Sequence, residues 1–509
     1  MKHLYTSTFL FLMVSILLIS CVSIGSCFAT PTIIIIFIVS IYSLYILYVR
    51  RQYRSLPNPP FRNFFIGNAE QLMLAKRNRH LLWIKWDKAY GPIFKLCIFH
   101  KIIVMVTSSS LAKTICLNSN YPKSNKLYKP LQVLLGEPFM GKGLLTECSH
   151  RIWRMHRSAV NPAFHKSFLK TLFPIFDRHA IRLVVKFNEL MKNGQSFSLM
   201  DYVNKVTTDI LFESVFSIKS RCLEDDDNIF HESVYTASRA ISESYNDPFF
   251  KYKPWNWREV ERRRQAVRFL RNFGKEILLE RLKTFDHNDE VNNDIIGFII
   301  RNSEKSNLSE DVLVDDFVTL FIAGQETTSN SLAFLFYLLA NNLDAKKKAQ
   351  KEVDKYFYVH SKIEHCDLKE LTYIEMCWRE ALRLYPPGYA TIREVTKGLE
   401  EVGGHILPVG TDIAINFIPI HYSNCADEAK FNPERMMSER DKPYTNIPFS
   451  LGQRSCIGRY FAEFEAKTLI ARILYNFDFK LCENQSFDVD EALTLRLCDG
   501  CRIELFPRT

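Results

Sequence analysis

The amino-acid sequence predicts a mainly α-helical protein with small β-sheets, anchored to a membrane at its N-terminus. Most of the chain from about residue 70 to 480 has apolar residues at helical spacing, whereas strand-like runs are short and few. The first 49 residues are mostly apolar. The 509 residues, 47% of them hydrophobic, can bury a large core, and no Gly/Ser-rich linker divides them. We therefore expect one large domain behind the anchor.

Two apolar stretches, residues 9–29 and 32–49, precede a basic segment. Each is about 20 residues long, which is enough to cross the ~30 Å hydrocarbon core of a bilayer. The basic segment that follows, residues 50–54, is expected on the cytosolic side of the membrane. The number of spans stays open among a helical hairpin, one anchor after a cleaved leader, and one tilted helix.

These features divide the chain into three parts. We predict membrane anchor segments over 1–49, a basic, proline-rich hinge over 50–60, and a cytosolic domain over 61–509. Because the cytosol keeps thiols reduced, the 13 cysteines need not pair.

A second membrane contact is predicted at residues 249–258. Aromatic and basic side chains alternate there, as they do at bilayer interfaces. Core aromatics beside a solvated basic helix are the alternative. The net charge of +10 suits an anionic membrane surface or an acidic partner. No nucleic-acid-binding motif accompanies the basic residues, so no nucleic-acid partner is expected.

Short runs typical of strands occur at residues 93–96, 102–106, 411–417, 493–497 and 502–506. The last two flank Asp499-Gly500, a turn signal that predicts a β-hairpin. Cys498 and Cys501 frame this turn as a C-x-x-C pair. A structural zinc site needs a second pair of ligands, and the turn alone explains the spacing.

The segment from Phe449 to Gly458 is the richest in candidate functional residues. It reads Phe-x-x-Gly-x-Arg-x-Cys-x-Gly, and a helical pattern begins just after Cys456. Free N–H groups at a helix start stabilise negative charge, so we expect a lowered pKa for the Cys456 thiol. Gly452 permits a tight turn, and Arg454 can reach an anionic group. A buried structural cysteine is the alternative.

A long helical pattern from about residue 309 to 341 contains Ala323-Gly324-Gln325-Glu326-Thr327-Thr328. A mid-helix glycine costs about 1 kcal/mol relative to alanine. A carboxylate beside a hydroxyl is also unfavourable in an apolar helix, so we expect a functional use for Glu326 and Thr327. The alternative is a helix kink in which the threonine bonds back to a helix carbonyl.

Two further pairs each share one face of a helix. Glu380 and Arg383 stand three positions apart, and Trp153 and Arg157 stand four apart. Alone, an exposed ion pair contributes only about 0–1 kcal/mol.

Together these motifs resemble those of the cytochromes P-450. The resemblance implies the fold of that family, a haem b cofactor, and Cys456 as the thiolate ligand of the iron. Phe449 would shield the sulfur, and Gly458 would let the backbone approach the macrocycle. Thr327 would form a hydrogen bond to dioxygen, and Glu326 would relay protons through water.

The resemblance also implies roles for several basic side chains. Four residues would lie at the haem propionates: Arg454, Trp153, Arg157 and Arg393. Arg435 would join Glu380 and Arg383 in a structural triad.

The implied activity is a monooxygenase that hydroxylates a lipophilic small molecule. The implied partner is a membrane-bound NADPH–cytochrome P-450 reductase in the endoplasmic reticulum membrane, with the catalytic domain in the cytosol. Residues 53–507 are similar to the cholesterol 24-hydroxylases, so we expect oxidation of a sterol side chain in a pocket lined by residues 387–392. A fatty-acid or xenobiotic hydroxylase is the alternative. A haem-thiolate isomerase or a non-catalytic haem-binding protein would not need Glu326 and Thr327.

Overall fold

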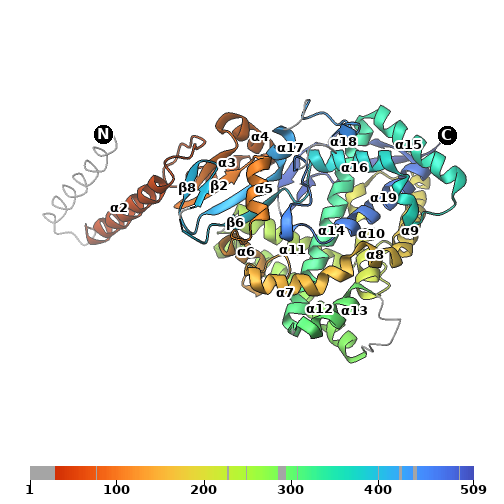
Figure 1. Cartoon of the computed structure of the whole chain (residues 1–509), viewed down its shortest axis with the longest axis horizontal. Coiled ribbons are helices and arrows are strands. Elements are labelled where there is room, and N and C mark those ends of the chain that lie inside the picture. Colours follow the sequence, from red (N-terminus) through yellow and green to blue (C-terminus); the bar gives the residue numbers. More distant parts are fainter. Residues whose placement is uncertain are drawn as a thin grey trace.

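The computed structural model describes residues 29–508 apart from gaps at 76, 226–227, 248, 285–293, 307, 399, 424–426, 439–443 and 492. A helix-rich body carries one long helix, α2 (Ala29–Gln52), that extends away from it (Figure 1). Residues Pro31–Gln52 are long and apolar enough to cross a membrane, and few of their side chains are buried. The first predicted apolar stretch lies almost wholly outside the described residues, so the number of spans stays a prediction.

The mainly helical class predicted from the sequence is confirmed. The described α-helices of the body are α3 (Ala69–Leu74), α4 (Arg79–Tyr90), α5 (Ser109–Leu117), α6 (Asn125–Gln132), α7 (His150–Val160), α8 (Lys166–Thr171), α9 (Phe173–Lys192), α10 (Leu199–Phe216), α11 (Ile229–Asn246), α12 (Trp257–Thr284), α13 (Ile295–Ser306), α14 (Glu310–Asn341), α15 (Leu343–Val359), α16 (Thr372–Leu384), α17 (Phe417–Ser423), α18 (Arg435–Ser438) and α19 (Arg459–Asn476). Short 3₁₀ turns include η1 (Asn161–Phe164), η2 (Phe250–Tyr252), η3 (Pro254–Asn256) and η7 (Gly452–Arg454).

The largest sheet lies beside the end of α2. Its strands run in the order β1 (Ile93–Ile98), β2 (Lys101–Val106), β9 (Asp412–Asn416) and β6 (Ala390–Glu394). β2 pairs in parallel with β9, and the other two pairings are antiparallel. The strands predicted near residues 93, 102 and 411 are thereby confirmed.

The hairpin predicted around Asp499-Gly500 is wrong. The strand after the turn, β13 (Arg502–Pro507), pairs with β10 (Phe477–Leu481) and β5 (Phe197–Ser198). The strand before it, β12 (Leu495–Leu497), pairs instead with β11 (Val489–Glu491). Gly500 has φ +69°, and a Cβ there would lie 2.3 Å from Ser198 Oγ. The turn therefore directs the chain from one sheet into another. Two-stranded ribbons β3 (Val133–Leu134) with β4 (Glu137–Pro138), and β7 (Glu400–Val402) with β8 (His405–Leu407), complete the described strands.

Helix α14 passes through the middle of the body, as Figure 1 shows, and packs against α10, α12, α16 and α19. Its first and last residues confirm the predicted helix. The negative charges of Glu310 and Asp311 in its first turn interact favourably with the positive end of the helix dipole. Gly324 lies against α10, where a Cβ would come within 3.0 Å of Leu211 Cδ2. The glycine therefore allows close packing here, and a larger residue would have to displace the Leu211 side chain slightly.

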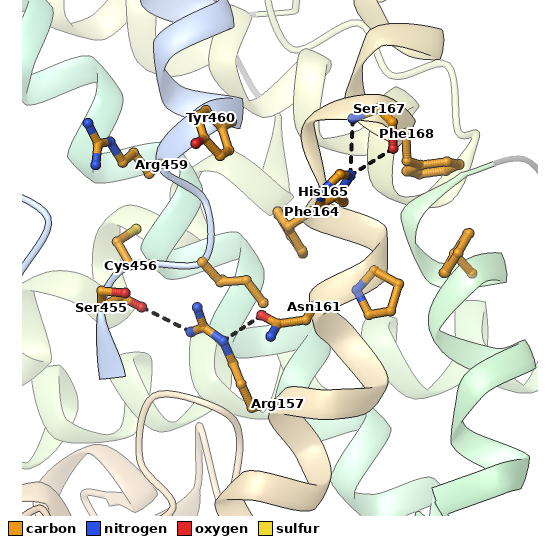
Figure 2. A pocket seen from close by; sticks show the side chains of 13 residues that line it. Arg157, Asn161, Phe164, His165, Ser167, Phe168, Ser455, Cys456, Arg459 and Tyr460 are labelled. Carbon is orange, nitrogen blue, oxygen red and sulfur yellow. Dashed lines mark hydrogen bonds between the residues drawn. The ribbon is translucent and has the colours of Figure 1, made fainter. Parts of the chain in front are cut away.

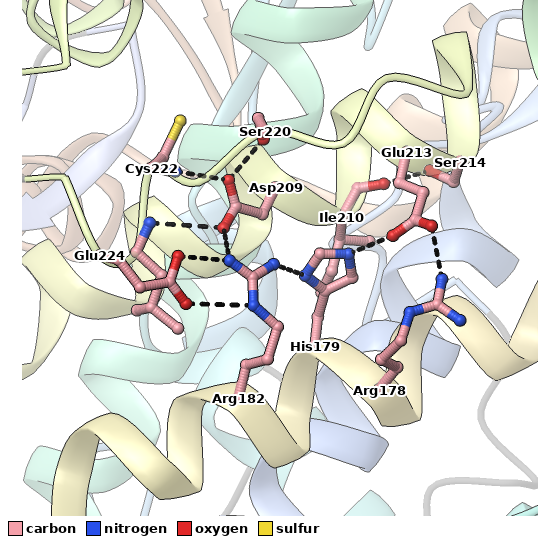
Figure 3. Close-up of polar contacts among 11 residues, drawn as sticks. Arg178, His179, Arg182, Asp209, Ile210, Glu213, Ser214, Ser220, Cys222 and Glu224 are labelled. Carbon is pink, nitrogen blue, oxygen red and sulfur yellow. Dashed lines mark hydrogen bonds and ion pairs between the residues drawn. The ribbon is translucent and has the colours of Figure 1, made fainter.

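A partly buried polar network joins α9 to α10 (Figure 3). His179 Nε2 lies 2.7 Å from Glu213 Oε2, and Arg178 donates to Glu213 Oε1 at 2.6 Å. Arg182 donates to His179 Nδ1 at 2.8 Å, so the neutral imidazole carries its proton on Nε2. Burial lowers the pKa of His179, which favours this neutral form.

Asp209 connects the same network to the loop that follows α10. The Asp209 carboxylate is fully buried and lies 3.1 Å from Arg182. It accepts hydrogen bonds from Cys222 N at 2.8 Å and from Leu223 N at 3.3 Å, and another from the Ser220 hydroxyl. Each charged group in this network therefore has an ion-pair or hydrogen-bond partner.

Candidate functional site

The cysteine loop is held in a conformation that its glycine permits. The Cys456 N–H donates to the Phe449 carbonyl at 2.9 Å, which closes the loop. Gly452 has φ +71°, and a Cβ there would lie 2.5 Å from the carbonyl oxygen of Cys116 in α5. Gly458 has φ −82° and caps α19. Cys456 is therefore presented between η7 and the start of α19, as the sequence predicted.

The predicted fall in the pKa of Cys456 is wrong for the protein atoms alone. Burial among protein groups is the largest effect and raises the pKa of the thiol. The Gly458 N–H, Arg157 and Arg459 lower it by smaller amounts. The helix-start effect is thus present but is outweighed by desolvation.

Two cavities meet at Cys456, and they leave part of the residue accessible. The larger encloses about 900 Å³ and lies among α7, η1, α8, α13 and α19 (Figure 2). Arg157 lines this cavity, donating to the Ser455 carbonyl at 3.0 Å and to Asn161 Oδ1 at 2.7 Å. The predicted Arg157 therefore does lie at the cysteine loop.

The smaller cavity, about 240 Å³, lies between α14 and the cysteine loop. Thr327 and Cys456 line the same cavity, although 129 positions of sequence separate them. Thr327 Oγ1 donates to the Ala323 carbonyl at 2.7 Å, the back-bonding foreseen as the alternative. Phe449 also lines this cavity and lies beside Trp378, with ring centroids 6.1 Å apart.

The predicted substrate-pocket segment is divided. Pro387, Gly388, Ala390 and Thr391 line the smaller cavity, but Tyr389 and Ile392 do not. Tyr389 is half-buried beside Glu491, and burial raises its pKa.

Basic side chains gather at one end of the smaller cavity. The guanidinium of Arg454 lies 3.9 Å from the centre of the Trp153 ring, and Arg454 Nη1 donates to the Glu147 carbonyl at 2.8 Å. Arg393 donates to Thr391 Oγ1 at 3.0 Å. In the described chain, the buried Nη2 atoms of both arginines have no hydrogen-bond partner. The predicted Arg454, Trp153 and Arg393 are therefore brought together.

Lys123 joins this basic group and was not predicted. Its Nζ donates to the Leu145 carbonyl at 2.6 Å and lies 4.4 Å from the centre of the Tyr128 ring. Burial, followed by Arg393 and Arg454, lowers the pKa of Lys123. Burial and Arg393 also lower the pKa of Arg454, to about 9. The local sequence offers no motif for Lys123, because its neighbours come from distant segments.

This basic group fits the two carboxylates of haem. Within the described chain, none of its cations forms an ion pair: Lys123, Arg157, Arg393 and Arg454. Like charges held together in a buried place are unfavourable unless an anion joins them. A thiol-bearing loop at the same cavity supplies a ligand for iron.

Glu326 points elsewhere. It lines a chamber of about 30 Å³ on another side of α14 and does not line the cavity at Cys456. Burial raises the pKa of Glu326, while Thr494, Arg496 and Ser238 lower it by smaller amounts. The predicted pair of Glu326 and Thr327 is therefore adjacent in sequence but faces two different spaces.

The predicted triad is assembled and buried. Arg383 donates to Glu380 through Nε at 2.7 Å and Nη2 at 2.9 Å, and both side chains are fully buried. Arg435 Nε lies 3.5 Å from Glu380 Oε1. The pair is therefore part of the core, where loss of one partner is costly.

The sequence model of the cytochrome P450 family matches residues 57–496. Among similar proteins, carotene epsilon-monooxygenase of Arabidopsis thaliana is 28% identical over 83% of this chain and 81% of its own length. Human cytochromes P450 4F8 and 4V2 are each 26% identical over 90% of this chain and 91% of their lengths. The chain belongs to the cytochrome P450 family and is a haem-thiolate monooxygenase.

Proposed function

We propose that the chain hydroxylates a lipophilic small molecule, with Cys456 as the axial thiolate ligand of haem b. The observation that carries this assignment is the meeting of Cys456, Thr327 and the unneutralised basic group at one cavity. When bound, the haem supplies the oxidation of an unactivated C–H bond by O2. The protein binds and orients the reactants, excludes water and handles protons.

Each group around the cavity has a separate task in this proposal. Arg454, Arg393 and Lys123 hold the haem carboxylates through charge-assisted hydrogen bonds. Trp153 supports Arg454 by stacking, and Arg157 steadies the cysteine loop through the Ser455 carbonyl.

Two residues bound the space beside the sulfur and haem. Phe449 shields the sulfur, and Gly458 at the start of α19 leaves room beside it. A Cβ built at Gly458 would lie 4.0 Å from Cys456 Sγ, an ordinary van der Waals contact.

Two side chains of α14 manage protons. Thr327 can release its bond to the Ala323 carbonyl and offer its hydroxyl to the cavity. Glu326 stores a proton on a carboxylate whose pKa burial has raised, closer to the value that suits a general acid at neutral pH.

We propose a sterol with an intact aliphatic side chain as the substrate. The extended likeness to cholesterol 24-hydroxylases motivates this choice. The small residues Gly388 and Ala390 at the cavity wall leave space for a ligand. The relative named for carotene also acts on an isoprenoid, which is consistent with a lipophilic substrate. A fatty-acid or xenobiotic hydroxylase is the second candidate.

Substrate class can be tested by adding sterols and long-chain fatty acids to the purified ferric protein. A substrate that displaces iron-bound water shifts the Soret band to shorter wavelength. We expect the larger shift from sterols, and a side-chain alcohol as product with NADPH and the reductase. A larger shift from fatty acids, with no oxidised sterol, would select the second candidate.

We further propose residence in the endoplasmic reticulum membrane, with residues 61–509 in the cytosol and the NADPH-dependent reductase as electron donor. A second membrane contact is supported by exposed Phe249, Tyr252, Trp255 and Trp257, whose side chains are 62–78% accessible. A chain lacking residues 1–49 should still bind anionic liposomes at low salt. Full recovery in the soluble fraction of a flotation assay would contradict the second contact.

A further inference from the structure

The loop between β4 and α7 is fastened to the N-terminal half of α14 by two buried carboxyl groups. Lys142 N donates to Asp315 Oδ2 at 2.7 Å. Leu144 N donates to Asp316 Oδ1 at 2.6 Å. A glycine permits the close approach, because Gly141 has φ +46° and a Cβ there would lie 2.1 Å from Asp315 Oδ2. The side chains of α14 therefore fix the backbone of this loop.

Two carbonyls of the same loop accept hydrogen bonds from the basic group described above. Lys123 Nζ donates to the Leu145 carbonyl at 2.6 Å, and Arg454 Nη1 donates to the Glu147 carbonyl at 2.8 Å. Leu145 directly follows Leu144, so the N–H group held by α14 and the carbonyl that contacts the lysine are one residue apart. Because each residue has only two soft backbone torsions, fixing the first group restricts the second.

Asp316 occupies its place at a cost to stability. The side chain is buried, and its Oδ2 has no hydrogen-bond partner within the described chain. Arg271 pairs with the neighbouring Asp315 at 2.6 Å, whereas no cation of the described residues pairs with Asp316. An apolar residue would avoid the cost of burying this carboxyl group. The bond to the Leu144 N–H is what the fold gains from it.

This bond does not require a negative charge. Burial raises the pKa of Asp316 to about 7, so a fraction of the side chain is a neutral acid at neutral pH. A protonated carboxyl group still has an oxygen that accepts a hydrogen bond. An asparagine of the same shape should therefore hold the loop as well.

The direction of the Lys123 ammonium depends on the loop. Its neighbours Leu145 and Tyr128 line the same cavity as Cys456, and the centre of the Tyr128 ring lies 4.4 Å from Nζ. An ammonium has three N–H donors, so the bond to the Leu145 carbonyl leaves others for a ligand. Burial lowers the pKa of Lys123, and a carbonyl that accepts from the ammonium favours its charged form.

We propose that Asp316 is a positioning residue for haem: by holding the Leu144 N–H, it sets the Leu145 carbonyl, which directs Lys123 toward a haem carboxylate. The inference rests on the proposed function, which assigns Lys123 to that carboxylate. Asp316 acts through the backbone and contacts neither the haem nor the substrate. Its loss should change how the haem carboxylate is held and leave the thiolate ligand in place.

The rate at which haem passes from the full-length ferric holoprotein to an excess of acceptor protein tests this role. Asp316→Leu keeps the size of the side chain and removes the acceptor. It should speed haem release by about fivefold, less than Lys123→Met, because the lysine is still present. Asp316→Asn should release haem nearly as slowly as the parent chain. In the Lys123→Met background, Asp316→Leu should change the rate little, because both residues act on one contact.

Two further variants separate this role from a general loss of folding. Thr319→Val alters another buried group of α14, a hydroxyl without a hydrogen-bond partner in the described chain, and should leave haem release unchanged. Gly143→Ala displaces the loop while Asp316 stays intact, since a Cβ there would lie 2.8 Å from the Asp315 carbonyl oxygen. Haem release should be faster in Gly143→Ala, and the difference should again disappear in the Lys123→Met background.

Resonance Raman spectroscopy gives a second readout, because the bending band of the haem carboxylates responds to their hydrogen bonds. Lys123→Met and Asp316→Leu should shift this band in the same direction, and Thr319→Val should not shift it. Parent-like release in Asp316→Leu and Gly143→Ala would overturn the inference, as would equal acceleration with and without Lys123. Silence of these variants alone leaves the assignment of Lys123 standing. If Lys123→Met also changes neither readout, that part of the proposed function fails together with the inference.

Discussion

Two buried polar clusters in this protein differ in how their charges are satisfied. The network joining α9 to α10 pairs Arg178 and Arg182 with carboxylates, and its histidine has a partner on each ring nitrogen. The group at the cavity of Cys456 brings Arg393, Arg454 and Lys123 together without an ion pair within the described chain.

The difference separates a structural role from a binding role. A network whose charges are paired stabilises the fold without a ligand. A network whose charges are unpaired favours the binding of a group of opposite charge. Figure 3 shows the first kind, in which every labelled charged side chain is engaged. Both clusters contain buried polar groups. They differ in the number of N–H donors that have no hydrogen-bond acceptor.

The largest expected effect is at the proposed iron ligand. Cys456→Ser should abolish the red-shifted Soret band of the reduced protein with carbon monoxide, because a neutral hydroxyl cannot replace an anionic sulfur donor. The measurement is a reduced carbon monoxide difference spectrum. Cys148→Ser, at a cysteine that does not line the cavity, serves as the control. Persistence of the band in Cys456→Ser would remove this residue from the ligand role.

In the satisfied network, Asp209→Ala should mainly cost stability. The change leaves two buried backbone N–H groups without their acceptor, while Arg182 keeps its pair with Glu224. Each unsatisfied buried donor costs about 1–3 kcal/mol. Urea unfolding should show the loss, while haem content per folded protein stays unchanged. A selective loss of haem would mean that the two clusters are not separate in role.

In the unsatisfied group, Lys123→Met should have the opposite pattern. Removing an unneutralised buried charge should stabilise the haem-free chain by on the order of 1 kcal/mol. Haem should leave about tenfold faster, since a charge-assisted hydrogen bond contributes about 1.5–3 kcal/mol. Transfer of haem to an acceptor protein measures the rate. Lys126→Met, at an exposed lysine paired with Glu394, is the control and should change neither quantity much.

The most gradual expected effect is the pH dependence of stability at His421, a buried group whose hydrogen bonds are satisfied. Its ring donates from Nδ1 to the Arg383 carbonyl at 3.1 Å and accepts from Ile447 N at 2.9 Å. Burial lowers its pKa to about 3. The unfolded chain binds this proton below about 6.5 and the folded chain does not, so stability falls as pH drops from about 6.5 toward 3.

The slope from this one group is at most about 1.4 kcal/mol per pH unit. His421→Gln should remove this slope, as measured by urea unfolding at pH values from about 7 to about 5, the range in which the unfolded histidine titrates. An unchanged slope would show that His421 binds its proton in the folded chain as well.

Local sequence was sufficient to predict those elements whose structure depends on interactions between near neighbours in the chain. The limits of α14 follow from its apolar periodicity and its acidic first turn, and the cysteine loop follows from five spaced residues. The turn at Asp499-Gly500 was misread because a turn signal does not say which strands pair. β12 and β13 found partners elsewhere, at β11 and β10.

The remaining site residues could not be predicted from the sequence, because the fold brings them together from distant parts of the chain. Lys123 is defined by Arg393 and Arg454, which lie 270 and 331 positions away in the chain. The same holds for Asp316, whose partner Leu144 lies 172 positions away. Glu326 and Thr327 were chosen from sequence, but their separate directions required the packing of α10 and α11 around α14.

The close approach of Gly452 to the Cys116 carbonyl links the cysteine loop to the end of α2. Cys116 belongs to a hydrophobic cluster that also contains Tyr53 and Leu56, immediately after α2. Leu451 of the loop packs against the same cluster. One continuous apolar body thus connects the end of α2 to the cysteine loop, so with α2 in a bilayer, as proposed, the fold would set the tilt and height of Cys456 above it.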